Sequence, residues 1–135
     1  LGIALARPER EIVVLDGDGN VLMGAGALCT VGALSPGKFR HVILDNEVHG
    51  STGDQRTISA TIDLLALARG AGYRWTGRAD DAGSLERALG ELGRAPAPAC
   101  LLVKVEKGNL PGVPRVEHEP PAIAERFARA VRRGP

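Results

Sequence analysis

Short runs of apolar and β-branched residues alternate along the chain with longer stretches in which apolar residues recur at helical spacing. The short runs are apolar at nearly every position, which predicts strands buried on both faces of a sheet. Glycine and proline separate many of these runs from the stretches beside them. We expect strands at 11–15, 41–45, 73–76 and 99–106.

The stretches between these strands have the apolar spacing of helices. Helices are expected at 20–34, 57–70 and 79–92, with a last one that begins at Pro120 or Pro121. The first stretch is small and apolar nearly all round, and Gly24, Gly26 and Gly32 would allow close packing. It therefore predicts a buried helix, despite a propensity cost of ~1 kcal/mol for each glycine. The apolar face of the last helix consists of Ile123, Phe127 and Val131.

The alternation of strand and helix predicts an α/β fold, a three-layer α/β/α arrangement whose mostly parallel sheet is covered by helices on both faces. Ligands bind such sheets at the carboxyl ends of the strands. Here these ends are the turn at 17–19 and the loop at 46–56, where polar residues concentrate. We therefore expect the functional site at this edge of the sheet.

Composition narrows the class of protein further. A length of 135 residues fits one domain, 1–135. Leu1 begins within an apolar, helix-compatible stretch, so we expect a leading segment to be missing. Seventeen basic and 16 acidic side chains give a formal charge of +1, which argues against nucleic acid and membrane surfaces as partners. No apolar stretch reaches the ~20 residues of a bilayer span.

The two cysteines, Cys29 and Cys100, are far apart and have apolar neighbours in the sequence. This favours buried core thiols over a disulfide or a reactive role. A reducing, cytoplasmic location is the corresponding expectation.

The pentapeptide D-G-D-G-N at 16–20 is the most informative motif. It is not the start of an EF-hand, because Val21 stands where that loop requires glycine and Ala27 where it requires glutamate. It is not a dinucleotide-binding fingerprint either, because Leu22 stands in place of the third glycine. A plain Asp-Gly turn in a β-hairpin remains an alternative.

A second polar position lies one strand further along. Twenty-six residues separate Gly19 from Asn46, and the predicted elements place Asp18 and Asn46 at the ends of neighbouring strands. Both side chains offer the hard oxygen atoms that Mg²⁺ prefers, and a backbone carbonyl, two phosphate oxygens and water would complete about six ligands. The free N–H groups of Gly19 and Asn20, at the start of the following helix, would favour an anionic diphosphate.

The combination of G-D-G with a strand-terminal Asn about two dozen residues later resembles the thiamine diphosphate motif. With the flanking L-D-N-E-V-H-G-S-T-G-D-Q-R-T, the stretch 12–57 resembles the cofactor domain of phosphonopyruvate and sulfopyruvate decarboxylases. Residues 1–10 look like the end of the helix that precedes G-D-G in these enzymes, and the second half of the chain is similar in element order only.

The resemblance implies that the side chains of Asp18 and Asn46 and the backbone carbonyl of Val48 ligate Mg²⁺. The cofactor-binding residues that it implies are Gly17, Asp18, Gly19, Asn20, Asn46 and Val48. Asn20 stands where serine is common in the family, and it keeps a polar side chain.

The segment 49–56 follows the predicted metal loop, and we expect it to line the reacting end of the cofactor. His49 is the candidate general acid or base. The candidate contacts to a substrate anion are Ser51, Thr52, Gln55 and Arg56. Alternatively, the segment leads into a helix capped by Asp54 or Thr57, and His49 is a hydrogen-bonded structural residue.

The resemblance implies a thiamine-diphosphate-dependent decarboxylase of a small acidic 2-oxo acid, such as phosphonopyruvate or sulfopyruvate. In this family a glutamate from a pyrimidine-binding domain activates the cofactor, and the chain has no trace of that domain. We therefore expect the chain to be inactive alone and to form its site within an oligomer, with a pyrimidine-binding partner. The alternatives are an acetolactate-synthase-like carboligase and a non-catalytic α/β interaction domain.

Overall fold

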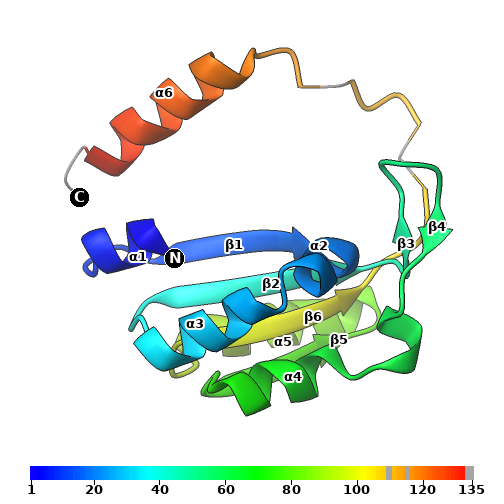
Figure 1. Cartoon of the computed structure of the whole chain (residues 1–135), viewed down its shortest axis with the longest axis horizontal. Coiled ribbons are helices and arrows are strands. Elements are labelled where there is room, and N and C mark those ends of the chain that lie inside the picture. Colours follow the sequence, from blue (N-terminus) through cyan, green and yellow to red (C-terminus); the bar gives the residue numbers. More distant parts are fainter. Residues whose placement is uncertain (109–110, 115, 133–135) are drawn as a thin grey trace.

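The computed structural model describes residues 1–108, 111–114 and 116–132 (Figure 1). Its centre is a sheet with the strand order β1-β2-β6-β5, in which all neighbouring strands are parallel. The strands are β1 (Ile12–Gly17), β2 (Phe39–Asp45), β5 (Trp75–Ala79) and β6 (Ala99–Lys104). The helices are α1 (Gly2–Ala6), α2 (Asp18–Met23), α3 (Gly26–Leu34), α4 (Leu64–Ala71), α5 (Ala82–Arg94) and α6 (Pro120–Arg132). Between β2 and α4 lie a small hairpin, β3 (Val48–His49) with β4 (Gln55–Arg56), and the 3-10 turn η1 (Ser59–Thr61).

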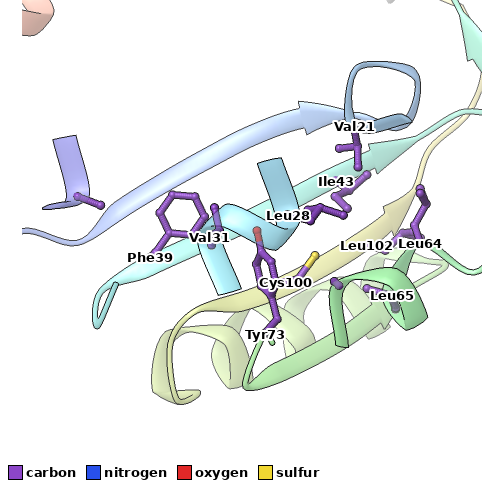
Figure 2. Packing of buried hydrophobic residues seen from close by; sticks show 12 residues of the cluster. Val21, Leu28, Val31, Phe39, Ile43, Leu64, Leu65, Tyr73, Cys100 and Leu102 are labelled. Atoms are coloured by element: carbon purple, nitrogen blue, oxygen red, sulfur yellow. The ribbon is translucent and has the colours of Figure 1, made fainter. Parts of the chain in front are cut away.

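Helices lie on both faces of the sheet, so the predicted three-layer α/β/α fold is confirmed. The larger core lies between the sheet and the helices α3 and α4, where Ile43 and Leu64 are almost completely buried (Figure 2). A second core lies on the opposite face, where α5 packs its buried Ala88 and Leu92 against β6. Burial of these apolar side chains is the main driving force for this arrangement.

The prediction that helices cover both faces is wrong for the outer half of one face. Val13 is 55% exposed and Leu15 is 70% exposed, although both belong to β1. The two side chains lie on the α5 face of the sheet, where the buried cluster contains residues of β2, β5, β6 and α5 but none of β1. An apolar run predicts that a strand has apolar faces, but it does not say which element packs on each of them.

The predicted helix at 20–34 is wrong in two respects. It consists of two helices, α2 and α3, because the chain leaves the helical path at Gly24 and Ala25. It is also buried on one side only, with Cys29 exposed, so the prediction of two buried thiols is correct for Cys100 alone. Close packing through Gly32 is confirmed, because a Cβ atom there would lie 1.6 Å from the backbone oxygen of Ala71 in α4.

The helix predicted at 57–70 begins seven residues later, at Leu64. The side chain of Asp63 caps it by accepting a hydrogen bond of 2.9 Å from the backbone N–H of Ala66. The preceding residues form η1 instead, and the N–H of Thr57 donates to the backbone oxygen of Glu47. Contacts distant in sequence thus replace the first predicted helical turns.

The second half of the chain follows the predicted order of elements. Helix α5 begins with a reciprocal capping box between Asp81 and Ser84. Helix α6 spans the predicted region, but its Ile123 and Phe127 side chains are exposed. None of the helices in the described part of the chain combines the length and apolar character needed to cross a bilayer.

Candidate functional site

The two predicted metal-binding side chains follow neighbouring parallel strands. Asp18 comes directly after β1 and Asn46 directly after β2, and these strands are paired up to Gly17 and Leu44. Both residues line one hollow of about 800 Å³ at the carboxyl edge of the sheet. The expectation of two adjacent strand ends is therefore met, whereas the hairpin alternative is wrong because α2 follows the G-D-G turn.

The carboxylate of Asp18 is buried, with the residue only 2% exposed. It is the first residue of α2, where the positive end of the helix dipole favours a negative charge. Its Oδ2 atom accepts a hydrogen bond from the hydroxyl of Thr57. A buried carboxylate with so few donors is costly unless a cation balances its charge.

Asp16, which precedes the G-D-G triplet, organises the turn. Its Oδ1 atom accepts hydrogen bonds from the N–H of Gly17 at 3.0 Å and from the side-chain amide of Asn20 at 2.5 Å. Its Oδ2 atom lies 3.4 Å from Nε2 of the buried His41, whose Nδ1 lies 3.1 Å from the hydroxyl of Tyr73. Burial lowers the pKa of His41, although the neighbouring Asp16 opposes this shift. This role of Asp16 could not be predicted from the sequence, because it depends on contacts with Asn20 and His41.

Asn46 lies in a tight turn between β2 and β3. Glu47 has a φ angle of 62°, in the left-handed region that is uncommon for such a residue. In this turn the N–H of Val48 donates a hydrogen bond of 3.1 Å to Oδ1 of Asn46. The amide oxygen has a second lone pair, which leaves it able to ligate a cation at the same time.

His49 lies against the G-D-G turn and is half-buried. A Cβ atom added to Gly19 would lie 2.4 Å from Cε1 and 2.5 Å from Nδ1 of the imidazole. The second glycine of the motif thus makes room for the ring, and both residues line the hollow. Whether His49 transfers protons stays a prediction.

The four predicted substrate contacts are not all brought together. Ser51 lines the hollow beside Asp18 and Asn46. Thr52 and Gln55 are exposed and bond to each other, with the threonine hydroxyl 2.8 Å from Oε1 of the glutamine. Arg56 is exposed in β4 and is absent from the lining of the hollow.

A polar network behind the hollow was missed by the sequence analysis. Asp45 accepts a hydrogen bond of 2.9 Å from the Ser59 hydroxyl at Oδ1 and another of 2.9 Å from Lys104 at Oδ2. The Lys104 ammonium group also donates to Glu47 at 2.6 Å. Burial lowers the pKa of Lys104, but the bonds to Glu47 and Asp45 outweigh this effect and raise it. The sequence signal for this network is a charged residue at the end of two apolar runs, Asp45 at the end of β2 and Lys104 at the end of β6.

The donor set fits a divalent cation that is shared with phosphate oxygens. Within the described ranges, no group of three or more His, Cys, Asp and Glu side chains could hold a metal ion by itself. One carboxylate and one amide oxygen at adjacent strand ends instead match the habit of Mg²⁺, which takes one or two protein carboxylates and completes its shell with phosphate and water. The fold and the residues at the carboxyl edge of the sheet define a class of protein, an α/β domain suited to binding a diphosphate with a metal ion.

Comparison with known families identifies the domain. The family model for the thiamine pyrophosphate enzyme C-terminal TPP binding domain matches residues 1–103. The chain therefore belongs to this family of thiamine-pyrophosphate-binding domains. The resemblance inferred from G-D-G and Asn46 is thereby confirmed.

Two relatives of known name are similar to this chain over most of its length. The chain is 43% identical over 127 residues to phosphonopyruvate decarboxylase of Streptomyces viridochromogenes, covering 94% of this chain and 32% of that protein. It is 42% identical over 132 residues to sulfopyruvate decarboxylase subunit beta of Methanothermobacter thermautotrophicus, covering 98% of this chain and 68% of that subunit. The chain thus spans about a third of the first relative and about two thirds of the second.

Solved structures agree on the fold. An enzyme from Mycobacterium smegmatis that is described as thiamin diphosphate-dependent superposes with a TM-score of 0.64 at 24% identity, over 79% of this chain and 21% of that one. Transketolase from Campylobacter jejuni gives a TM-score of 0.58 at 14% identity, over 76% of this chain and 17% of that one. At these identities the likeness concerns the architecture alone.

Proposed function

We propose that this chain is the Mg²⁺- and thiamine-diphosphate-binding half of a decarboxylase that acts on a small acidic 2-oxo acid, such as phosphonopyruvate or sulfopyruvate. The observation that carries the proposal is the placement of Asp18 and Asn46 at adjacent parallel strand ends around one hollow. The names of relatives at 42–43% identity support the reaction and the substrate class.

Each residue of the proposed metal site has a distinct part. The carboxylate of Asp18 supplies the negative charge, and the amide oxygen of Asn46 and the backbone carbonyl of Val48 complete the protein ligands. The N–H groups of Gly19 and Asn20 face the diphosphate, near the start of α2. The bonds from Asp16 support this role because they fix the turn that carries both N–H groups.

When bound, thiamine diphosphate supplies the electron sink for the loss of CO₂, and the protein supplies binding and orientation. In this proposal His49 and Ser51 are the candidates for the reacting end, because, of the five residues predicted there, they line the hollow with Asp18 and Asn46. His49 then holds or transfers a proton at its imidazole. Thr52, Gln55 and Arg56 bind the substrate anion only if the β3–β4 hairpin turns towards the hollow.

A partner chain or domain completes the site. The name "subunit beta" of the sulfopyruvate relative supports a second subunit, and the chain covers only 32% of the phosphonopyruvate relative. We propose that this partner binds the aminopyrimidine ring, supplies the activating glutamate and makes the active enzyme an oligomer. The chain alone is then inactive.

A reducing, cytoplasmic location is also proposed. Both cysteines are free thiols and Cys29 is exposed, which favours a compartment where thiols stay reduced.

The test is calorimetric titration of thiamine diphosphate with Mg²⁺ into the full-length protein, together with any subunit that co-purifies. Asp18→Asn keeps the size of the side chain and removes its charge, so the affinity is expected to fall at least about 100-fold. Asp54→Asn removes an exposed charge from the nearby loop and should leave the affinity unchanged. Equal affinities for Asp18→Asn and the wild type would overturn the metal site.

Product analysis tests the reaction. Release of a free aldehyde from phosphonopyruvate or sulfopyruvate supports a decarboxylase, whereas a ligated hydroxyketone would show a carboligase. Unchanged binding of a protein partner after Asp18→Asn, without any affinity for the cofactor in the wild type, would show an interaction domain.

A further inference from the structure

The carboxylate of Asp18 lies at one end of a row of polar contacts that reaches the end of another strand. Thr57 Oγ1 donates to Asp18 Oδ2 at 2.5 Å, and it lies 2.9 Å from the hydroxyl oxygen of Ser59. The Ser59 hydroxyl donates to Oδ1 of Asp45 at 2.9 Å. All four residues are buried, so these contacts are shielded from water.

Asp45, at the far end of this row of contacts, is held firmly. Both oxygens of Asp45 are engaged, because Oδ1 also accepts a bond of 3.1 Å from the N–H of Glu47 and Oδ2 binds Lys104 at 2.9 Å. The Asp45 side chain is 4% exposed, and the positive charge of Lys104 balances its negative charge. Asp45 is therefore an anchor for the Ser59 hydroxyl, and Lys104 already supplies its positive partner.

Asp18, at the near end of the row, differs from Asp45 in one respect. Among the described residues, Thr57 donates to Oδ2 of Asp18 and none donates to Oδ1, which is not a fully buried atom. The hydroxyl thus fixes the rotation of the carboxylate and leaves one oxygen for another partner. Asp18 lines the hollow that Asn46 also lines, so the remaining oxygen is available to a cation at the proposed metal position.

We propose that Thr57 and Ser59 are positioning residues for the metal ligand Asp18, and that they set the affinity of the site for its divalent cation. This inference rests on the proposed function. Groups that orient a metal ligand usually change the affinity for the metal about 10–100-fold when they are removed. Because Thr57 bonds to Asp18 and Ser59 bonds to Asp45, the segment 57–59 also links the ends of β1 and β2.

The test measures Mn²⁺, a paramagnetic substitute for Mg²⁺, by electron paramagnetic resonance in the presence of saturating thiamine diphosphate. The protein is the full-length wild type with any co-purifying subunit. Thr57→Val keeps the shape of the side chain without its hydroxyl, and it should raise the Kd of Mn²⁺ at least about tenfold. Thr57→Ser restores the hydroxyl and should bring the Kd back to within about threefold of the wild type.

Two further variants separate positioning from a general loss of stability. Thr61→Val is the matched control, because Thr61 is exposed and its hydroxyl bonds only to the backbone oxygen of Ile58. Its Kd should equal that of the wild type. Ser59→Ala removes the support behind Thr57 and should raise the Kd by a smaller factor, so it also serves if Thr57→Val does not fold.

The outcomes are distinguishable. A lower melting temperature of Thr57→Val or Ser59→Ala with an unchanged Kd for Mn²⁺ would show that the hydroxyls serve the fold alone, and the inference would be wrong. A wild-type protein that binds no Mn²⁺ together with thiamine diphosphate would overturn the proposed function itself. A Kd that rises in Thr57→Val and recovers in Thr57→Ser supports positioning.

Discussion

Alanine is predicted to destabilise the protein at one glycine of G-D-G and to be tolerated at the other. A Cβ atom on Gly19 would lie 2.4 Å from Cε1 of His49, whereas nothing lies within 4 Å of a Cβ atom on Gly17. Carbon atoms prefer separations of ~3.5–4.0 Å, so the imidazole must move by more than ~1 Å. The displacement costs about 1–3 kcal/mol, of which the better helix propensity of alanine returns less than ~1 kcal/mol. Gly19→Ala should therefore lower the stability by about 1–2 kcal/mol and the melting temperature by about 3–8 °C.

The assay is thermal unfolding of the cofactor-free protein, followed by circular dichroism. Gly17→Ala should stay within ~0.5 kcal/mol of the wild type, because its φ of −95° and ψ of 153° suit any residue. A double-mutant cycle then isolates the contact, since Gly19→Ala should cost almost nothing in a His49→Ala background. If Gly19→Ala lowered the melting temperature equally in both backgrounds, the reasoning from the ring contact would be refuted.

Three other predictions concern the core and the buried polar groups. Gly32→Ala should destabilise by about 3 kcal/mol in urea unfolding, because its Cβ would meet the backbone of Ala71, which cannot rotate away. Burial lowers the pKa of His41. Below pH ~6.5 the unfolded chain therefore binds a proton that the native protein does not, and the free energy of unfolding decreases as the pH is lowered. His41→Gln should remove up to ~1.4 kcal/mol per pH unit from the slope of unfolding free energy between pH ~7 and ~5, and an unaltered slope would contradict this. In thiol titration of the native protein, exposed Cys29 should react and Cys100 should not, because burial raises the pKa of Cys100 to about 12.

The strands and the location of the candidate site could be predicted because they depend on local sequence patterns. Runs such as 11–15 and 99–106 are apolar at nearly every position, and the structure has β1 and β6 there. Asp18 and Asn46 follow two such runs that are consecutive along the chain. Consecutive strands of an α/β sheet commonly pair, which places the two side chains at one edge.

The helix boundaries could not be predicted because contacts distant in sequence determine them. Ile58 and Ile62 are four residues apart, as on one face of a helix, yet Ile58 is 60% exposed. The hydroxyls of Thr57 and Ser59 instead bond to carboxylates that lie 39 and 14 residues earlier in the chain. These buried bonds outweigh the weak local preference for a helix.

The pattern of hydrogen-bond donors supports the proposed metal ligand independently of the motif. Three aspartates lie at the ends of β1 and β2, and a sequence cannot rank them because each is a carboxylate next to a glycine or an asparagine. In the described part of the chain, both oxygens of Asp16 and both oxygens of Asp45 have polar partners. Asp18 alone has a single donor, from Thr57, although it is the most buried of the three. Asp18 is thus the aspartate at these two strand ends with the fewest protein donors, which supports a cation as its partner, and it is also the one that lies within G-D-G.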